Sequence, residues 1–253
     1  MSELVFEIDD HVAVLTINRP EARNAATLAL SQAMAEAIDR INEDADIRAV
    51  ILTGAGGHFC AGMDLKGFLR GELPRIEGRG FAGLTEAPPK KPLIAAVEGF
   101  ALGGGFELAL ACDLIVASRT ARFGLPEVKR GLVARAGGVL RLPRQMPHRK
   151  ALELLMTGRF MEPEEAERLG LINEVVAEGE ALAGARELAA QIVANGPLAV
   201  AAVKEIVSRA PDWPVDEMFQ RQRPFTDPVF ASQDAKEGAR AFAEKRPPQW
   251  AGQ

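Results

Sequence analysis

Hydrophobic and polar positions alternate along the chain with the period of strands in some segments and of helices in others. Residues 4–20, LVFEIDDHVAVLTINRP, alternate on either side of Asp9-Asp10, which predicts a β-hairpin. Residues 27–44 carry apolar residues at helical spacing and predict an amphipathic helix. Three apolar runs, 47–54, 91–99 and 112–118, predict buried strands. Strands that alternate with helical segments are typical of an α/β protein with a largely parallel sheet.

Two segments depart from this alternation. Residues 70–90 are rich in glycine and proline and lack a period, which predicts a long mobile loop beside a site. After about residue 178 the pattern becomes helical throughout. We expect a helical tail there that packs on a neighbouring subunit.

Composition narrows the class of protein. The chain has 253 residues, enough for one large domain or one domain with an appendage. Hydrophobic residues make up 47% and charged residues 26%, as in ordinary globular proteins. A net charge of −5 argues against a nucleic-acid partner and against an anionic membrane surface, so an anionic ligand needs a local basic cluster.

The termini and the cysteines point to a reducing compartment. The first ten residues have neither the basic region nor the apolar region of a signal peptide, and we expect a cytoplasmic protein. Cys60 and Cys112 have no C-x-x-C spacing, and with three scattered histidines they form no metal-ligand pattern. We therefore expect two small buried thiols and no metal.

Residues 99–113, GFALGGGFELALACD, place three glycines between a predicted strand and a predicted helix. A helix N-terminus exposes free N–H groups, and glycines let another atom approach them closely, so a developing oxyanion would be stabilised there. Glu107 lies on a helix that is apolar all round and has no basic partner on its own face. It is a candidate general acid or base, the alternative being a tight turn with a carboxylate at the helix dipole.

Two further segments add to this picture. Residues 52–68, LTGAGGHFCAGMDLKGF, form a second glycine-rich junction with free N–H groups near Gly62-Met63. Glu127 directly follows Pro126, which by itself indicates only the start of a helix. The spacing of the glycines excludes the dinucleotide and P-loop fingerprints, and no G-x-S-x-G is present.

Five motifs in order along nearly the whole chain resemble the crotonase (enoyl-CoA hydratase/isomerase) superfamily. They are NRPEARNA at 18–25, FCAGMDLK at 59–66, KPLIAAVEGFALGGGFELALACD at 91–113, FGLPEVKRG at 123–131 and AFAEKR at 241–246. Within the superfamily, GFAGLTE, GGGFELALA, GGVLRLP and AFAEKRPPQW are most similar to a carnitinyl-CoA dehydratase subgroup. The resemblance implies an α/β fold, a ββα superhelix with a C-terminal helical trimerisation region. It places the acyl-CoA-binding core in residues 1–195 and the helical region in 196–253.

The resemblance also implies the chemistry. An acyl-CoA thioester is the substrate, and neither a cofactor nor a metal is needed. The backbone N–H groups of Met63 and Gly104 would form the oxyanion hole. Glu107 would activate a water for attack at C3 and Glu127 would deliver a proton to C2, so the implied protein is an enoyl-CoA hydratase, a lyase of fatty acid metabolism. An isomerase, a carnitinyl-CoA dehydratase and a non-catalytic acyl-CoA-binding paralogue stay open as alternatives. The implied assembly is a homotrimer or a hexamer made of two trimers.

Binding residues are carried over by motif position. The CoA-contact positions are Arg23, Ala61, Gly62, Asp64, Leu65, Lys66, Gly103 and Lys245. For Arg23, Lys66 and Lys245 the alternative is a solvated surface cation. At 134–135 the chain reads Ala-Arg where many hydratases have Pro-Gly. Arg135 keeps the backbone N–H but adds a cation near the chemistry, which predicts discrimination against cationic acyl groups if the side chain faces the acyl pocket. The alternative is that this side chain turns outward or pairs with an acid such as Glu127 or Glu86, so that only its N–H matters.

Overall fold

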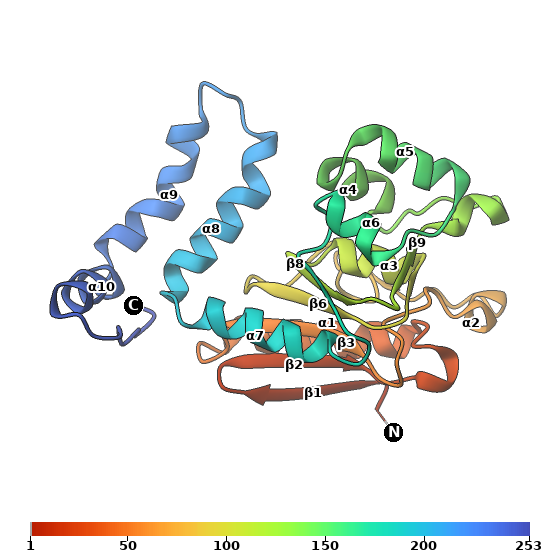
Figure 1. The fold of residues 1–253 in the computed structure, drawn as a ribbon, viewed down its shortest axis with the longest axis horizontal. Helices are drawn as coiled ribbons and strands as arrows, with labels where there is room; N and C mark the ends of the chain where they lie inside the picture. The colour runs from red at the N-terminus through yellow and green to blue at the C-terminus, as the bar shows by residue number, and fades with distance from the viewer. Residues whose placement is uncertain (1) are drawn as a thin grey trace.

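The computed structural model describes residues 2–253 and is organised around a six-stranded sheet (Figure 1). The strands lie in the order β1 (Leu4–Asp9), β2 (Val12–Ile17), β3 (Ala49–Gly54), β6 (Leu93–Val97), β8 (Leu114–Ser118) and β10 (Glu174–Val176). β1 and β2 form the predicted antiparallel hairpin. The remaining pairings are parallel. The predicted α/β class with a largely parallel sheet is confirmed.

Both faces of the sheet are covered, and alternate side chains serve different layers. Leu15 and Leu52 belong to the same apolar cluster as the buried face of α1 (Leu28–Glu43). Val14 and Ile51 belong to a second cluster, which contains the small buried side chains of α7 (Ala181–Val193). A strand turns successive side chains to opposite faces, so a sheet covered on both faces needs continuous apolar runs. That is the pattern of residues 47–54 and 91–99.

A second, two-stranded sheet brings the candidate site together. β7 (Phe100–Leu102) pairs in parallel with β9 (Arg122–Gly124), and α3 (Gly104–Leu110) begins two residues after β7. The 3₁₀ helix η2 (Pro126–Arg130) follows β9. Because the two strands are parallel, the segments that follow them start at the same edge. A parallel bridge from Ala101 to Cys60 adds the second glycine-rich junction beside β7.

Residues 70–90, for which we expected a long mobile loop, contain a short hairpin and buried side chains. The short helix α2 (Leu65–Leu69) is followed by a hairpin of β4 (Arg75–Ile76) and β5 (Gly80–Phe81). The three side chains of Ala82, Leu84 and Thr85 are completely buried. Strands of two residues are too short to show a period in the sequence, so the order of this segment comes from its packing against α1.

The remaining helices complete two ends of the molecule. One end carries α4 (Gly138–Gln145), α5 (His148–Thr157) and α6 (Pro163–Arg168), shown in green in Figure 1. A 3₁₀ helix, η1 (Pro20–Ala22), lies between β2 and α1. The other end is the C-terminal arm, which we define as residues 197–253. It contains α8 (Pro197–Arg209), η3 (Ala210–Asp212), α9 (Met218–Ala231) and α10 (Gln233–Glu244).

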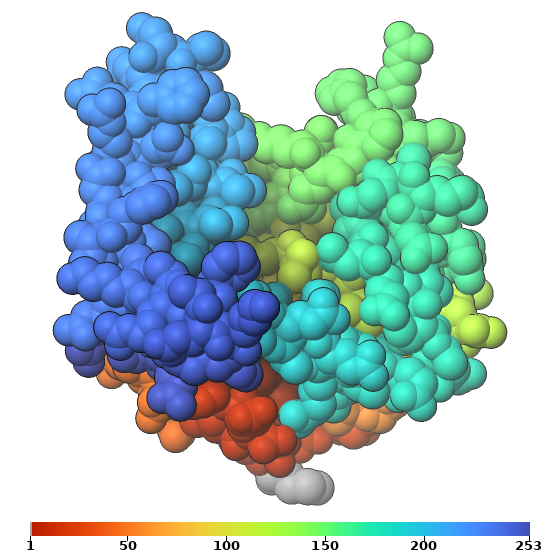
Figure 2. Space-filling view, turned by 60° about the vertical axis from the view of Figure 1, so that its left-hand side comes forward, coloured from red at the N-terminus to blue at the C-terminus, as the bar shows by residue number. Residues whose placement is uncertain are grey.

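The C-terminal arm lies to one side of the sheet, away from α2 and β9 (Figure 1). Lys204 of α8 anchors it, since its Nζ donates to the carbonyl oxygens of Pro89 and Lys91 and pairs with Asp113 at 2.6 Å. A groove of about 1090 Å³ separates α8 from α4 and opens as a hollow between the arm and the rest of the molecule in Figure 2. The division of the chain at residue 195 stays a prediction.

Candidate active site

Two backbone N–H groups lie side by side where the glycine-rich junctions meet. A Cβ placed on Gly62 would stand 2.9 Å from the carbonyl oxygen of Leu102 and 3.5 Å from the nitrogen of Gly104. Gly62 has a φ of +99°, which side chains rarely adopt. Within residues 2–253, the N–H groups of Met63 and Gly104 donate no backbone hydrogen bond. Both are therefore free to bind an oxygen from outside the chain.

Each of the three consecutive glycines is required for a different steric reason. Gly103 has a φ of +55°. A Cβ on Gly104 would stand 2.4 Å from Cζ of Phe81, so the aromatic ring covers the helix N-terminus. A Cβ on Gly105 would stand 2.0 Å from the carbonyl oxygen of Cys60. Only glycines allow α3 to start in so small a space between β5 and the Cys60 segment.

Glu107 lies in the first turn of α3 and is 3% exposed. Its Oε1 accepts a hydrogen bond of 2.8 Å from the N–H of Gly138, the first residue of α4. Burial raises the pKa of Glu107 from 4.5 to about 7, and the nearby charge of Glu127 acts in the same direction. The carboxyl is therefore able to change its protonation state near neutral pH, as a general acid or base requires.

Glu127 reaches the same place from η2. Its Oε1 would stand 3.1 Å from a Cβ placed on Gly103, and its buried Oε2 has no hydrogen-bond partner in residues 2–253. Burial raises the pKa of this carboxyl as well. Leaving a buried acceptor unpaired is costly, so an atom of a ligand or a water is the natural partner for Oε2.

A single cavity of about 380 Å³ contains both carboxyls and both free N–H groups. Its lining includes Met63, Gly104, Glu107 and Glu127. The remaining wall is mainly apolar and is formed by Phe68, Leu73, Pro74, Phe81, Leu132, Val133 and Ala136. An apolar wall with a few convergent polar groups is the usual form of a small-molecule site. The sequence predicted the two N–H donors, the two carboxyls and Arg135, and it missed the apolar wall.

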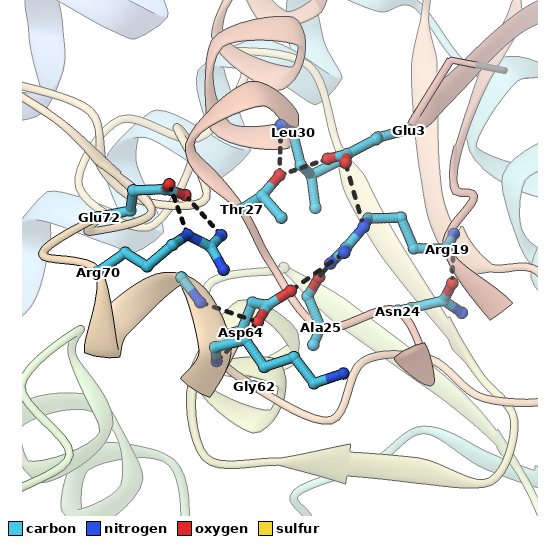
Figure 3. Close-up of polar contacts among 12 residues, drawn as sticks. Glu3, Arg19, Asn24, Ala25, Thr27, Leu30, Gly62, Asp64, Arg70 and Glu72 are labelled. Atoms are coloured by element: carbon cyan, nitrogen blue, oxygen red, sulfur yellow. Dashed lines mark hydrogen bonds and ion pairs between the residues drawn. The ribbon is translucent and has the colours of Figure 1, made fainter. Parts of the chain in front are cut away.

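A polar network around Arg19 and Asp64 holds the segment that contains Met63 (Figure 3). Arg19 pairs with Glu3 at 3.1 Å and with Asp64 at 3.0 Å, and it is largely buried. The other oxygen of Asp64 accepts the N–H groups of Lys66 and Gly67 and so caps α2. These bonds lower the pKa of Asp64. We call the Arg19–Asp64 pair the clasp, because it ties the residue next to Met63 to the segment after β2.

The predicted CoA-contact positions are not all brought together. The carbonyl oxygen of Arg23 accepts the N–H of Ala61, and the guanidinium lies 5.3 Å from the centroid of the Phe100 ring. Leu65 and Lys66 are exposed on α2, next to the cavity residue Phe68. Asp64 uses its carboxylate within the chain.

The other two predicted cations lie in different parts of the molecule. Lys245 ends α10 in the C-terminal arm and lies outside the cavity. Arg135 lines the cavity.

Three charged residues near the cavity were not among the predicted site residues. Arg75 and Glu86 line it and pair at 3.3 Å. Arg141 of α4 donates to the carbonyl oxygen of Thr85 at 2.6 Å and lies close enough to Glu107 to affect its pKa. Arg75 and Glu86 fall in the segment interpreted as a loop, where no period marks which side chains turn inward. Arg141 resembled any helix-surface arginine.

Neither metal binding nor membrane spanning finds direct support. Residues 2–253 contain no group of three or more His, Cys, Asp or Glu side chains placed to hold a metal ion. In that same range, no individual helix combines the length and apolar character of a membrane span. α7 and residues 197–212 together have the required length and apolar character, but the two helices are bent by 109° relative to each other.

The fold and the site together define the class of protein. The parallel sheet, the second small sheet and the two glycine-rich junctions form the crotonase fold. The chain belongs to the enoyl-CoA hydratase/isomerase family, whose sequence profile matches residues 7–253.

Individual relatives are close along the full length. The chain is 48% identical over 246 residues to a carnitinyl-CoA dehydratase of Salmonella enteritidis, covering 94% of each protein. The crystal structure of an enoyl-CoA hydratase from Mycobacterium marinum superposes with a TM-score of 0.98 at 55% identity and covers 100% of each chain. That of a carnitinyl-CoA hydratase from Mycobacterium avium gives a TM-score of 0.80 at 46% identity, again with 100% of each chain covered.

Proposed function

We propose that this protein is an enoyl-CoA hydratase that adds water across the C2–C3 double bond of an enoyl-CoA thioester. The observation that carries the proposal is the meeting in one cavity of two free N–H groups and two carboxyls of raised pKa, one buried and one partly buried. Hydration needs one group that accepts a proton and one that gives a proton. The names of the relatives, hydratase and dehydratase, describe this reaction and its reverse.

The thioester carbonyl binds between the N–H groups of Met63 and Gly104. Negative charge develops on its oxygen as the double bond is attacked, and preorganised donors stabilise that charge most in the transition state. The Phe81 ring over Gly104 keeps bulk water away from these donors. In a cavity of low dielectric the two hydrogen bonds are stronger than in water.

The water binds between Glu107 and Glu127. As its oxygen forms a bond to C3, Glu107 takes one of its protons and the electrons of the C2–C3 bond move to the thioester oxygen. Glu127 then gives its proton to C2 and the carbonyl is restored, so the product is a 3-hydroxyacyl-CoA. The Gly138 N–H keeps Glu107 in place through both steps.

The CoA portion lies along the outer rim of the site, at Arg23 and Lys66. Both cations belong to segments next to the Met63 junction, which fits a chain that carries an excess of acidic residues elsewhere. Their attraction for the CoA phosphates is solvent-exposed and therefore decreases with salt.

Assembly into a homotrimer or a dimer of trimers is part of the proposal. Val203 and Val207 of α8 are 61% and 66% exposed, and Phe230 and Phe242 of the C-terminal arm are 83% and 87% exposed. Large apolar side chains in one region indicate a surface that another protein covers. Sedimentation analysis of the purified chain tests this assembly.

The activity is tested with crotonyl-CoA, by loss of the absorbance of its conjugated thioester and by identification of 3-hydroxybutyryl-CoA. We expect hydration by the native protein and hydration that is slower by about 10²–10⁴-fold by Glu107→Gln. Isomerisation of 3-enoyl-CoA without hydration would instead identify an isomerase. Tight binding without any turnover of crotonyl-CoA or carnitinyl-CoA would identify a non-catalytic acyl-CoA-binding protein.

A further inference from the structure

The end of the cavity away from the oxyanion donors is charged. Glu86 and Arg135 line both the cavity and the larger groove beside α8, whereas Met63, Gly104 and Glu127 line only the cavity. Glu86 and Arg135 therefore lie where the cavity opens toward the groove. An acyl chain whose thioester sits at the oxyanion donors points its far end toward these two residues, both of which are exposed.

Positive charge is in excess at this end. Glu86 already pairs with Arg75, and both side chains are about half exposed. Arg135 takes part in none of the ion pairs found among residues 2–253. Arg141 adds a third cation in the groove lining, where it donates to the Thr85 carbonyl oxygen and lies near both Glu107 and Glu86. This end of the cavity and the adjoining groove thus carry Glu86 together with three guanidinium groups, and guanidinium groups are always charged.

We propose that the charged end of the cavity selects acyl groups that end in a carboxylate and disfavours those that end in a quaternary ammonium. A terminal carboxylate accepts hydrogen bonds from Arg135, whose planar guanidinium suits that geometry. A terminal trimethylammonium meets the unpaired Arg135 and has to displace Arg75 from Glu86. The inference deepens the proposed function, on whose orientation of the thioester it rests. It also separates this chain from a protein that acts on carnitinyl-CoA.

The test uses three saturated acyl-CoA ligands of similar length, because they bind without reacting. Glutaryl-CoA ends in a carboxylate, valeryl-CoA is neutral and γ-butyrobetainyl-CoA ends in a trimethylammonium. Their CoA parts are identical, so differences in Kd by calorimetry report only the acyl end. We expect glutaryl-CoA to bind about 10-fold more tightly than γ-butyrobetainyl-CoA, as two half-exposed charge interactions would give.

Charge variants of opposite sign test the assignment to these residues. The ratio of the Kd of γ-butyrobetainyl-CoA to the Kd of glutaryl-CoA should fall about 3-fold in Arg135→Gln. It should fall further in Arg75→Gln, because that change also leaves Glu86 without its partner. Glu86→Gln should widen the ratio. Arg119→Gln, at an exposed arginine that lines neither the cavity nor the groove, is the matched control and should leave the ratio unchanged.

Two results would overturn the inference. One is equal binding of the anionic and cationic ligands by the native protein. The other is a ratio that none of the cavity variants changes. Hydration of crotonyl-CoA is measured separately, so that loss of the proposed function and loss of this selectivity are told apart.

Discussion

The proposed catalytic centre (Met63, Gly104, Glu107 and Glu127) and the proposed CoA-binding rim at Lys66 on α2 lie next to each other and are built in different ways. The centre consists of backbone N–H groups and buried carboxyls that packed glycines, α3 and α4 hold from several directions. The rim carries the exposed Lys66 on a helix of five residues, and the clasp holds the start of that helix. Chemistry depends on sub-ångström placement, whereas phosphate binding tolerates movement. The comparison predicts that changes in the centre lower kcat strongly, whereas changes in the rim weaken CoA binding by small amounts.

The largest effect should come from the carboxyls. Glu107→Gln and Glu127→Gln should each lower kcat for crotonyl-CoA hydration by about 10²–10⁴-fold, because each removes one proton-transfer group. The amide oxygen introduced by Glu107→Gln can still accept the Gly138 N–H, so the fold and CoA binding should be retained. Steady-state kinetics with calorimetric Kd values check this, and near-native turnover in either variant would remove that residue from the mechanism.

Removal of an oxyanion donor should cost about 10²-fold or more in kcat. Gly104→Pro deletes the N–H, but the ring would also collide with Phe81. We therefore compare Gly104→Pro with Gly104→Ala, both in a Phe81→Ala background that opens the space. The alanine variant keeps the N–H and should retain the activity of the background. Equal activity in the two variants would show that the Gly104 N–H takes no part in catalysis.

The raised pKa of Glu107 predicts a cost in stability at high pH. The folded state holds this proton more strongly than the unfolded state, so stability is lost as pH rises from 4.5 through about 7. The free energy of unfolding of Glu107→Gln, relative to that of the native protein, should rise by up to about 3 kcal/mol between pH 4.5 and pH 8. Urea unfolding at the two pH values measures the gain, and a constant difference would contradict the pKa shift.

Breaking the clasp should have an intermediate effect. Arg19→Met leaves Asp64 without its cation, and losing such a charged hydrogen bond typically costs about 1.5–3 kcal/mol. Because Asp64 adjoins Met63, part of that loss should appear as a lower kcat, about 10-fold, with a smaller change in KM. Asp64→Asn, which keeps a good helix cap, is the companion variant. A change in KM alone would show that the clasp affects CoA binding and not the position of the Met63 N–H.

The smallest effect should come from Lys66. Lys66→Ala should weaken binding of CoA thioesters by a few-fold at low salt and leave kcat unchanged, since an exposed charge pair contributes about 0.2–1 kcal/mol. The difference from the native protein should vanish as salt is raised. Lys90→Ala, an exposed lysine outside the cavity lining, is the control. Salt-independent binding would mean that the phosphates lie in solvent.

Local patterns in the sequence were sufficient for much of this protein. The hairpin about Asp9-Asp10 follows from alternation of apolar and polar residues, because a strand buried on one face alternates. The strands at 47–54 and 91–99 follow from continuous apolar runs, because a strand buried on both faces is apolar throughout. The glycine runs marked close approaches of backbone. Glu107 was recognisable as a buried acid because its own helix offered it no partner and no polar face.

Only the tertiary structure decided which of these segments meet and what surrounds them. Glu127 became more than a helix-start residue because β7 and β9 pair in parallel and begin α3 and η2 at one edge. The clasp joins residues 45 positions apart, and Arg75, which pairs with Glu86, lies on a strand of two residues. Such contacts leave no period in the chain, because they depend on packing between elements rather than on repetition within one.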